Sequence, residues 1–189
     1  MYFSLIPQYT SGLNQIQYVD VASFNNESRY ILGSLAKKIY DLSLRINVSF
    51  TPELSLQYYA QPYIFAGKYS DYKRINDPRA SRFTDRYHQF SNNEISFNES
   101  WNAYMIDEDH DGADDYGFYK PDFHFLQFRS NMVLRWEYKT GSSLYLVWSQ
   151  GRTDVQQDGE NNLSQYLNEL RDIHPRNDFM LKISYLVVL

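Results

Sequence analysis

The sequence has 189 residues, of which 43% are hydrophobic and 22% charged, with 18 Lys and Arg against 23 Asp and Glu and no Cys. This length fits one domain or part of a larger one, and the lack of cysteine excludes a disulfide scaffold, Cys-ligated metal sites and thiol catalysis. A net charge of −5 without a basic block argues against a nucleic-acid partner. No apolar run approaches the roughly 20 residues that a membrane helix needs.

Aromatic residues are frequent: 18 Tyr, 12 Phe and 3 Trp make up 17% of the chain, while the mean hydropathy is −0.58. A soluble α/β enzyme usually carries more Ala, Gly, Leu and Val. A tyrosine-rich chain that is polar on average indicates a β-sandwich, a β-binding module or an outer-membrane barrel. Composition alone does not choose among these three classes.

The first seven residues have no basic region, no long apolar region and no small-residue cleavage site, so they do not resemble a secretory signal. We therefore expect either a complete cytoplasmic chain or the later part of a longer chain whose signal lies upstream.

Period-two alternation predicts a long strand over residues 39–50, because a strand places every second side chain on one face and a helix does not. A weaker strand is expected at about residues 15–24. Residues 51–53 (Thr-Pro-Glu) predict a tight turn, and a second alternating strand follows over residues 54–72, which makes a β-hairpin. The residues on the apolar face of the first long strand are Leu42, Leu44, Ile46, Val48 and Phe50.

A second hairpin is expected near the C-terminus, with strands at residues 128–138 and 144–150 around a turn at 140–143, followed by a last strand at 179–189. Within the intervening segment, residues 161–173 carry an i, i+3, i+4, i+7 apolar stripe that predicts a short helix in a loop, ended by Pro175. The residues of that stripe are Leu163, Tyr166, Leu167 and Leu170.

The polar and acidic stretch over residues 76–122 is expected to be a long loop, and loops of this length are usually functional.

Strand length favours the barrel over the sandwich, which remains the alternative. Strands of soluble proteins average about 5–6 residues, whereas residues 39–50 extend to about 40 Å, enough to cross a bilayer at a tilt. Short turns and long connections alternate between the two ends of the predicted sheet, as in outer-membrane barrels. In this orientation the even positions of 42–50 face lipid, while Arg45 and Asn47 face a hydrated lumen. Aromatic residues beside the short turns, where an interfacial girdle would lie, are Phe50, Trp136 and Tyr138.

Several motifs resemble the C-terminal end of a family of Bacteroidota proteins, in which a family-nine-type carbohydrate-binding module precedes a large domain of unknown function described as an outer-membrane β-barrel. The resemblance covers nearly the whole chain from about residue 15 and corresponds to the last third of the family. The segments that carry it are Tyr30-Ile31-Leu32, Leu42-Ser43-Leu44-Arg45, residues 54–62 (LSLQYYAQP), 67–74 (GKYSDYKR), 76–80 (NDPRA) and 128–138 (FRSNMVLRWEY).

The resemblance implies an outer-membrane location and a single domain over residues 1–189 that is the C-terminal fragment of a larger barrel. The partners it implies are outer-membrane lipid and the missing N-terminal strands and binding module of the same protein. Carbohydrate is implied only by domain association.

The predicted fold class is accordingly all-β: an antiparallel up-and-down meander of long strands, forming part of a transmembrane β-barrel, with one short helix near residues 161–173. About six crossing strands are expected, whereas closed bacterial barrels begin at eight. An open sheet in lipid would leave two unpaired edges, so these strands should not complete a barrel alone.

The acidic segment from Asp107 to Asp115 contains the one metal-like spacing. Carboxylates at positions 1, 3, 5 and 9 of a calcium loop, with Gly112 at position 6, predict a weak calcium site. Position 12 is Phe118 instead of the usual Glu, the flanking segments are expected to be strands, and a solvated acidic loop is the alternative interpretation. The four candidate ligands are Asp107, Asp109, Asp111 and Asp115.

No catalytic motif is present, and the four histidines are dispersed without metal-binding spacing, so we do not expect an enzyme; a glycoside hydrolase is disfavoured. Aromatic residues of the long loop are expected to stack on sugars or to pack within the loop; they include Tyr69, Tyr72, Tyr87, Trp101, Tyr104, Tyr116 and Tyr119. The leading functional hypothesis is a surface scaffold or pore in the outer membrane, with a role in carbohydrate binding or uptake. The alternative is a soluble β-sandwich carbohydrate-binding module.

Overall fold

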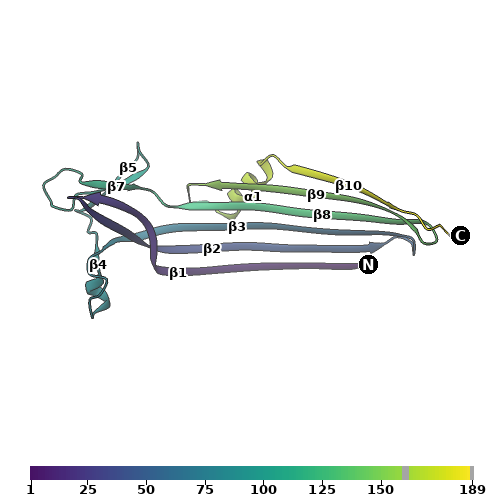
Figure 1. Ribbon diagram of the computed structural model, residues 1–189, viewed down its shortest axis with the longest axis horizontal. Coiled ribbons are helices and arrows are strands. Elements are labelled where there is room, and N and C mark those ends of the chain that lie inside the picture. The colour runs from purple at the N-terminus through teal and green to yellow at the C-terminus, as the bar shows by residue number, and fades with distance from the viewer. Residues whose placement is uncertain (159–161, 188–189) are drawn as a thin grey trace.

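The structure is a computed structural model that describes residues 1–158 and 162–187. Six long strands form the body of the molecule, and short strands gather at one end of it (Figure 1). The elements are β1 (Tyr2–Phe24), β2 (Glu27–Ser49), β3 (Leu54–Ile75), a 3₁₀ turn (Phe83–Arg86), β4 (Tyr87–Gln89), β5 (Ile95–Asn98), β6 (Ala103–Ile106), β7 (Tyr116–Tyr119), β8 (Phe123–Lys139), β9 (Ser142–Gln156), α1 (Leu163–Asp172) and β10 (Arg176–Ser184).

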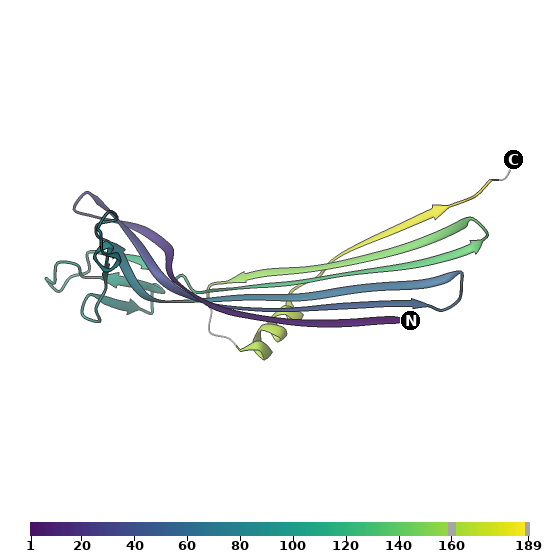
Figure 2. The same ribbon diagram turned by 90° about the horizontal axis from the view of Figure 1, so that it is seen from below.

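The main sheet has the strand order β1-β2-β3-β8-β9-β10, and every neighbouring pair is antiparallel. Among the described residues this sheet is open, with β1 and β10 as its edges, and β4 adds a short pairing to β3. It extends as one long layer with both chain ends near the same end (Figure 2). The predicted antiparallel meander of long strands is therefore confirmed.

The predicted hairpin turns are confirmed, with small differences in their bounds. Thr51 stabilises the first turn, since its Oγ1 accepts a hydrogen bond of 3.0 Å from the Leu54 N–H. The second turn comprises only Thr140 and Gly141, where Gly141 has φ +75°, a value that favours glycine. The last strand, β10, runs over 176–184 rather than the expected 179–189.

The N-terminal part of the sheet is longer than expected. The prediction of a strand at residues 15–24 was too short, because β1 begins at Tyr2 and joins β2 through Asn25 and Asn26, which have φ of 52° and 62°. Two consecutive residues with positive φ are typical of the tight turn between hairpin strands. Pro7 obscures the pattern in the sequence, and an edge strand such as β1 tolerates it.

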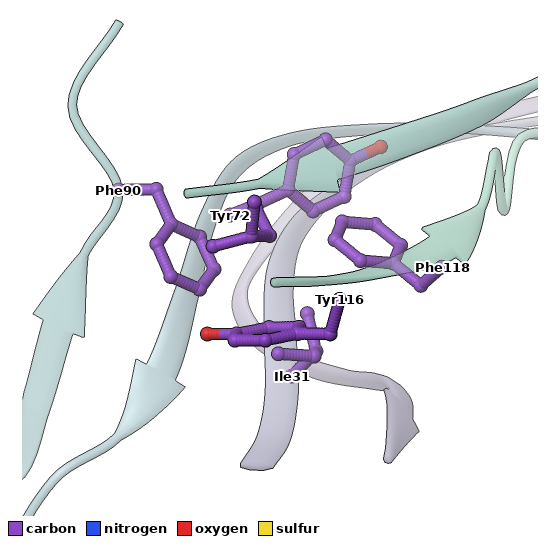
Figure 3. Packing of buried hydrophobic residues seen from close by; sticks show 6 residues of the cluster. Ile31, Tyr72, Phe90, Tyr116 and Phe118 are labelled. Carbon is purple, nitrogen blue, oxygen red and sulfur yellow. The ribbon is translucent and has the colours of Figure 1, made fainter. Parts of the chain in front are cut away.

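The stretch over residues 76–122, here called the cap, is not the irregular loop that its polarity predicts. It contains the 3₁₀ turn, β4 and a three-stranded sheet in the order β5-β6-β7. A buried cluster packs this sheet against the ends of β2 and β3 (Figure 3). Its buried residues are Ile31, Tyr72, Phe90, Ile106, Tyr116 and Phe118.

Helix α1 confirms the predicted helix near residues 161–173. It begins at a capping box, in which Asn162 and Gln165 each bind the other's backbone N–H, at 3.0 and 2.8 Å. Its buried side chains, Tyr166 and Leu170, pack on the sheet beside Ile64 and Leu126. Within the described part of the chain, no helix is both long and apolar enough to pass through a membrane.

Candidate functional site

The most distinctive feature of the main sheet is the contrast between its two faces. Residues directly opposite one another in antiparallel strands project to the same face, so the register defines rows across the sheet. One row is apolar on all six strands: Phe3, Ile46, Tyr58, Met132, Trp148 and Phe179. The next row on the same face is also apolar: Val48, Leu56, Leu134, Leu146 and Leu181. We call this side the apolar face.

The opposite side, the polar face, carries a row that is polar on all six strands: Ser4, Arg45, Tyr59, Asn131, Ser149 and Asp178. The Arg45 guanidinium lies 5.5 Å from the centre of the Tyr59 ring, and the Tyr59 hydroxyl donates to Gln61 Oε1 at 2.7 Å. The Ser149 hydroxyl donates to Asn131 at 2.9 Å. The polar side chains thus bind one another along the sheet, and the opposite orientation of Ile46 and Arg45 agrees with the alternation in the sequence.

Much of the apolar face is exposed. Phe179, Leu181 and Ile183 on β10 are 72%, 60% and 63% exposed, and Phe3 on β1 is 58% exposed. Helix α1 packs on this face and covers the part near Ile64. Since a contiguous exposed apolar surface marks an interaction site, this face requires a partner.

The acidic loop between β6 and β7 brings three of the four predicted calcium ligands together. Carboxylate oxygens of Asp107, Asp109 and Asp115 lie within 4.8 Å of one another. Backbone N–H groups hold two of these side chains in place: Asp115 Oδ2 accepts from Glu108 at 2.7 Å, and Asp107 Oδ2 accepts from Gly112 at 3.0 Å. Gly112 has φ +90°, which a glycine adopts without strain.

The fourth predicted ligand, Asp111, lies outside this group. Its carboxylate accepts a hydrogen bond of 2.8 Å from the Ala113 N–H. Phe118, at the twelfth position, is only 3% exposed and belongs to the cap core, so it offers no ligand atom. The expected strands flank the loop as β6 and β7. The loop thus presents three carboxylates as a candidate cation site.

A partly buried ion cluster, which the sequence did not reveal, lies behind this loop. Glu108 accepts hydrogen bonds of 3.0 and 3.1 Å from Arg29 Nε, and one of 2.6 Å from the Tyr116 hydroxyl. Arg74 lies 3.5 Å from the same carboxylate. Burial alone would raise the pKa of Glu108, but these hydrogen bonds and the two cations lower it below its usual value. The cluster joins the cap to β2 and β3.

The aromatic residues of the cap divide into two groups. Tyr72 and Tyr116 are buried in the cap core, which agrees with packing, the second of the two predicted roles, and not with stacking on a sugar. Trp101 and Tyr119 are 62% and 73% exposed and line an open cleft of about 250 Å³ together with Asp20. The exposed rings of Trp101 and Tyr119 beside an acidic side chain are an arrangement suited to contact with a sugar.

Comparison with protein-family models, curated proteins and solved structures finds no match for this chain.

Proposed function

We propose that the main sheet is part of the wall of an outer-membrane β-barrel, with the apolar face toward lipid and the polar face toward a hydrated lumen. The observation that carries this proposal is the apolar row across all six strands, half-buried on the inner strands and exposed at Phe3 and Phe179, directly beside a fully polar row on the other face. A soluble sandwich needs a second sheet over the apolar face. A bilayer covers the same surface with hydrocarbon.

The dimensions of the apolar face support this proposal. On β2 and the turn that follows it, every second residue from Tyr40 to Phe50 is apolar or aromatic, which is about 34 Å along the strand. At a tilt of about 40° this length spans about 25 Å of membrane thickness, which is the height of the apolar band of outer-membrane barrels. Aromatic residues occupy both ends of the segment, as an interfacial girdle requires.

The slope of the band is a second, independent support. On β1 and β2 the apolar face ends at the paired Tyr9 and Tyr40, whereas on β9 and β10 it ends at Trp148 and Phe179, three rows nearer the short turns. Three rows are about 20 Å along the strands, and the change takes place between β2 and β9, which are three strand spacings or about 14 Å apart. The border of the apolar face is therefore oblique to the hydrogen-bond direction, as expected of strands that are tilted in a membrane.

Closure of the wall requires partners for both edges. Within the described sheet, the hydrogen-bonding groups on the outer sides of β1 and β10 have no neighbouring strand, and a bilayer does not satisfy such groups. We propose that further N-terminal strands of the same protein pair with these edges. The cap would then lie outside the membrane, at the end away from the short turns.

Single-cysteine labelling tests the proposal directly, because the chain has no cysteine of its own. We expect a water-soluble maleimide to label Asn47→Cys at least tenfold faster than Ile46→Cys in cell-envelope preparations of the full-length protein. A lipid-soluble maleimide should label Ile46→Cys. Equal labelling of both positions by the water-soluble reagent would contradict the proposal, and protection of Ile46→Cys from both reagents would favour the sandwich.

The cleft of the cap supports a second candidate function, contact with carbohydrate. Trp101 and Tyr119 offer ring faces, and the Asp20 carboxylate can accept hydrogen bonds from hydroxyl groups. Titration with oligosaccharides, followed by tryptophan fluorescence, should give a change that Trp101→Phe abolishes. The same change with Trp101→Phe would exclude the cleft as the sugar site.

A further inference from the structure

Helix α1 is ordered at its first turn and fixed to the sheet at its last turn. Its capping box at Asn162 orders the first turn. At the other end, Arg152 of β9 donates to the main-chain oxygens of Leu170, at 3.2 Å, and of Arg171. A cation at the C-terminal end of a helix also stabilises the helix dipole. The helix is therefore a rigid element at the border of the apolar face.

Between α1 and the first three strands lies an open groove of about 360 Å³. On the helix side it is lined by Leu163 and Leu167, which are four residues apart and 40% and 45% exposed. On the sheet side, the lining side chains of the apolar face are Pro7, Tyr9, Tyr40, Leu42, Pro62 and Ile64. The groove is thus narrow, apolar and open at its surface.

We propose that this groove binds one acyl chain of an anionic membrane phospholipid, an inference that rests on the proposed membrane position of the sheet. The groove is continuous with the apolar face, since Leu42 is followed two residues later by Leu44 of the next row. A lipid chain beside the protein wall therefore enters it without crossing polar surface. Without a lipid chain, water in the groove would contact the apolar surfaces of leucine, proline and tyrosine side chains, which is unfavourable.

The positive charge of Lys38, beyond the Tyr40 end of the groove, is the reason we expect an anionic lipid headgroup. Lys38 lies two residues beyond Tyr40 on the same face of β2, opposite Ser11, and is exposed. Its ammonium group is therefore placed where a lipid phosphate meets the aqueous phase. Tyr9 and Tyr40, whose ring centres are 5.0 Å apart, mark the boundary between the two regions.

The test is retention of phosphatidylglycerol by the full-length protein, measured by native mass spectrometry after purification in detergent. The unchanged protein should retain one lipid. Leu42→Trp fills the groove and should reduce retention at least fivefold, whereas Leu44→Trp, on the same face but outside the groove, should retain it as the unchanged protein does. Lys38→Ala should weaken retention of phosphatidylglycerol about fivefold and leave phosphatidylcholine unaffected.

Equal retention by the Leu42 and Leu44 variants would overturn the proposal. If Leu42→Trp does not fold, Leu163→Trp fills the same groove from the exposed side of the helix and decides the question. The cysteine labelling of Ile46 and Asn47 separates the two proposals. If the labelling shows Ile46 in lipid but Leu42→Trp retains phosphatidylglycerol like the unchanged protein, only the groove proposal is rejected. If the labelling shows Ile46 in water, both the groove proposal and the membrane proposal are rejected.

Discussion

The Nε2 atom of His124, on β8, lies 2.9 Å from Oε2 of Glu169 on helix α1. On the other side of the ring, Nδ1 lies 2.7 Å from the main-chain oxygen of Asp158 and 2.9 Å from its carboxylate. Both ring nitrogens thus face oxygen atoms. The fully buried His124 side chain connects the sheet to both ends of the segment that carries α1.

Removal of this histidine should loosen the helix. We expect His124→Ala to destabilise the docked helix by about 1–3 kcal/mol, because polar groups of the interface lose their partner. Hydrogen exchange of the α1 amides, residues 166–172, measures this directly and should be faster in the variant. His174→Ala changes an exposed histidine just beyond the helix and should leave the exchange unchanged. Equal exchange in both variants would mean that His124 does not hold the helix.

The long strands were predictable because the side chains on the two faces of the sheet have opposite polarity. Ile46 and Arg45 differ in polarity, and the same difference recurs along β2, β3 and β8, so the alternation is visible in the sequence. The helix was predictable because Tyr166 and Leu170 lie on one stripe that packs on the sheet.

Other features depend on contacts that span the chain. The strands of the cap have only three or four residues, too few for a period to be recognised, and they are held by packing around Tyr72 and Phe118. Arg29 and Glu108 meet across 79 residues, and nothing in the local sequence pairs them. From its spacing in the sequence, Asp111 is as good a candidate ligand as Asp109. In the structure the backbone turns of the loop separate the two carboxylates, and only that of Asp109 lies in the group.

Charge at neighbouring positions of β2 should have very different costs. We expect Ile46→Arg to destabilise the full-length protein by about 2–4 kcal/mol in lipid, because it places a charge near the middle of the apolar band. Asn47→Arg, on the polar face, should cost much less. Denaturant unfolding in lipid vesicles compares the two variants. Equal tolerance of arginine at both positions would reject the proposed orientation of the sheet.

The 189-residue chain by itself should aggregate in water and require detergent. Its apolar face exposes residues such as Phe179 and Leu181, and its edges β1 and β10 can pair with other chains. Size-exclusion chromatography with light scattering, with and without detergent, measures this. A monodisperse monomer that unfolds cooperatively in water would contradict the membrane proposal and favour a sandwich.

The cap should lose stability in acid through Glu94. Burial alone would raise the pKa of this carboxyl group, but hydrogen bonds from Ser91 and His88 lower it to about 2. A carboxyl group with a lowered pKa in the folded state contributes stability above its ordinary pKa of 4.5, and this contribution is lost as the pH falls towards 2. Thermal unfolding of the full-length protein should therefore show a loss of stability between about pH 4.5 and 2 that is smaller in Glu94→Gln. An identical pH profile in the two proteins would contradict this role.

Calcium should bind the acidic loop weakly and discriminate between two neighbouring aspartates. Asp107, Asp109 and Asp115 converge, but a loop without the twelfth-position ligand should bind with a Kd of about 10⁻⁴–10⁻³ M, as extracellular modules do. Calorimetric titration of the full-length protein should lose its binding heat in Asp109→Ala and keep most of it in Asp111→Ala, whose carboxylate lies outside the group. The loop should become ordered without a change in the stability of the main sheet, because it lies outside the strand ladder. Identical heats in all three proteins would leave a solvated acidic loop held by its own backbone hydrogen bonds.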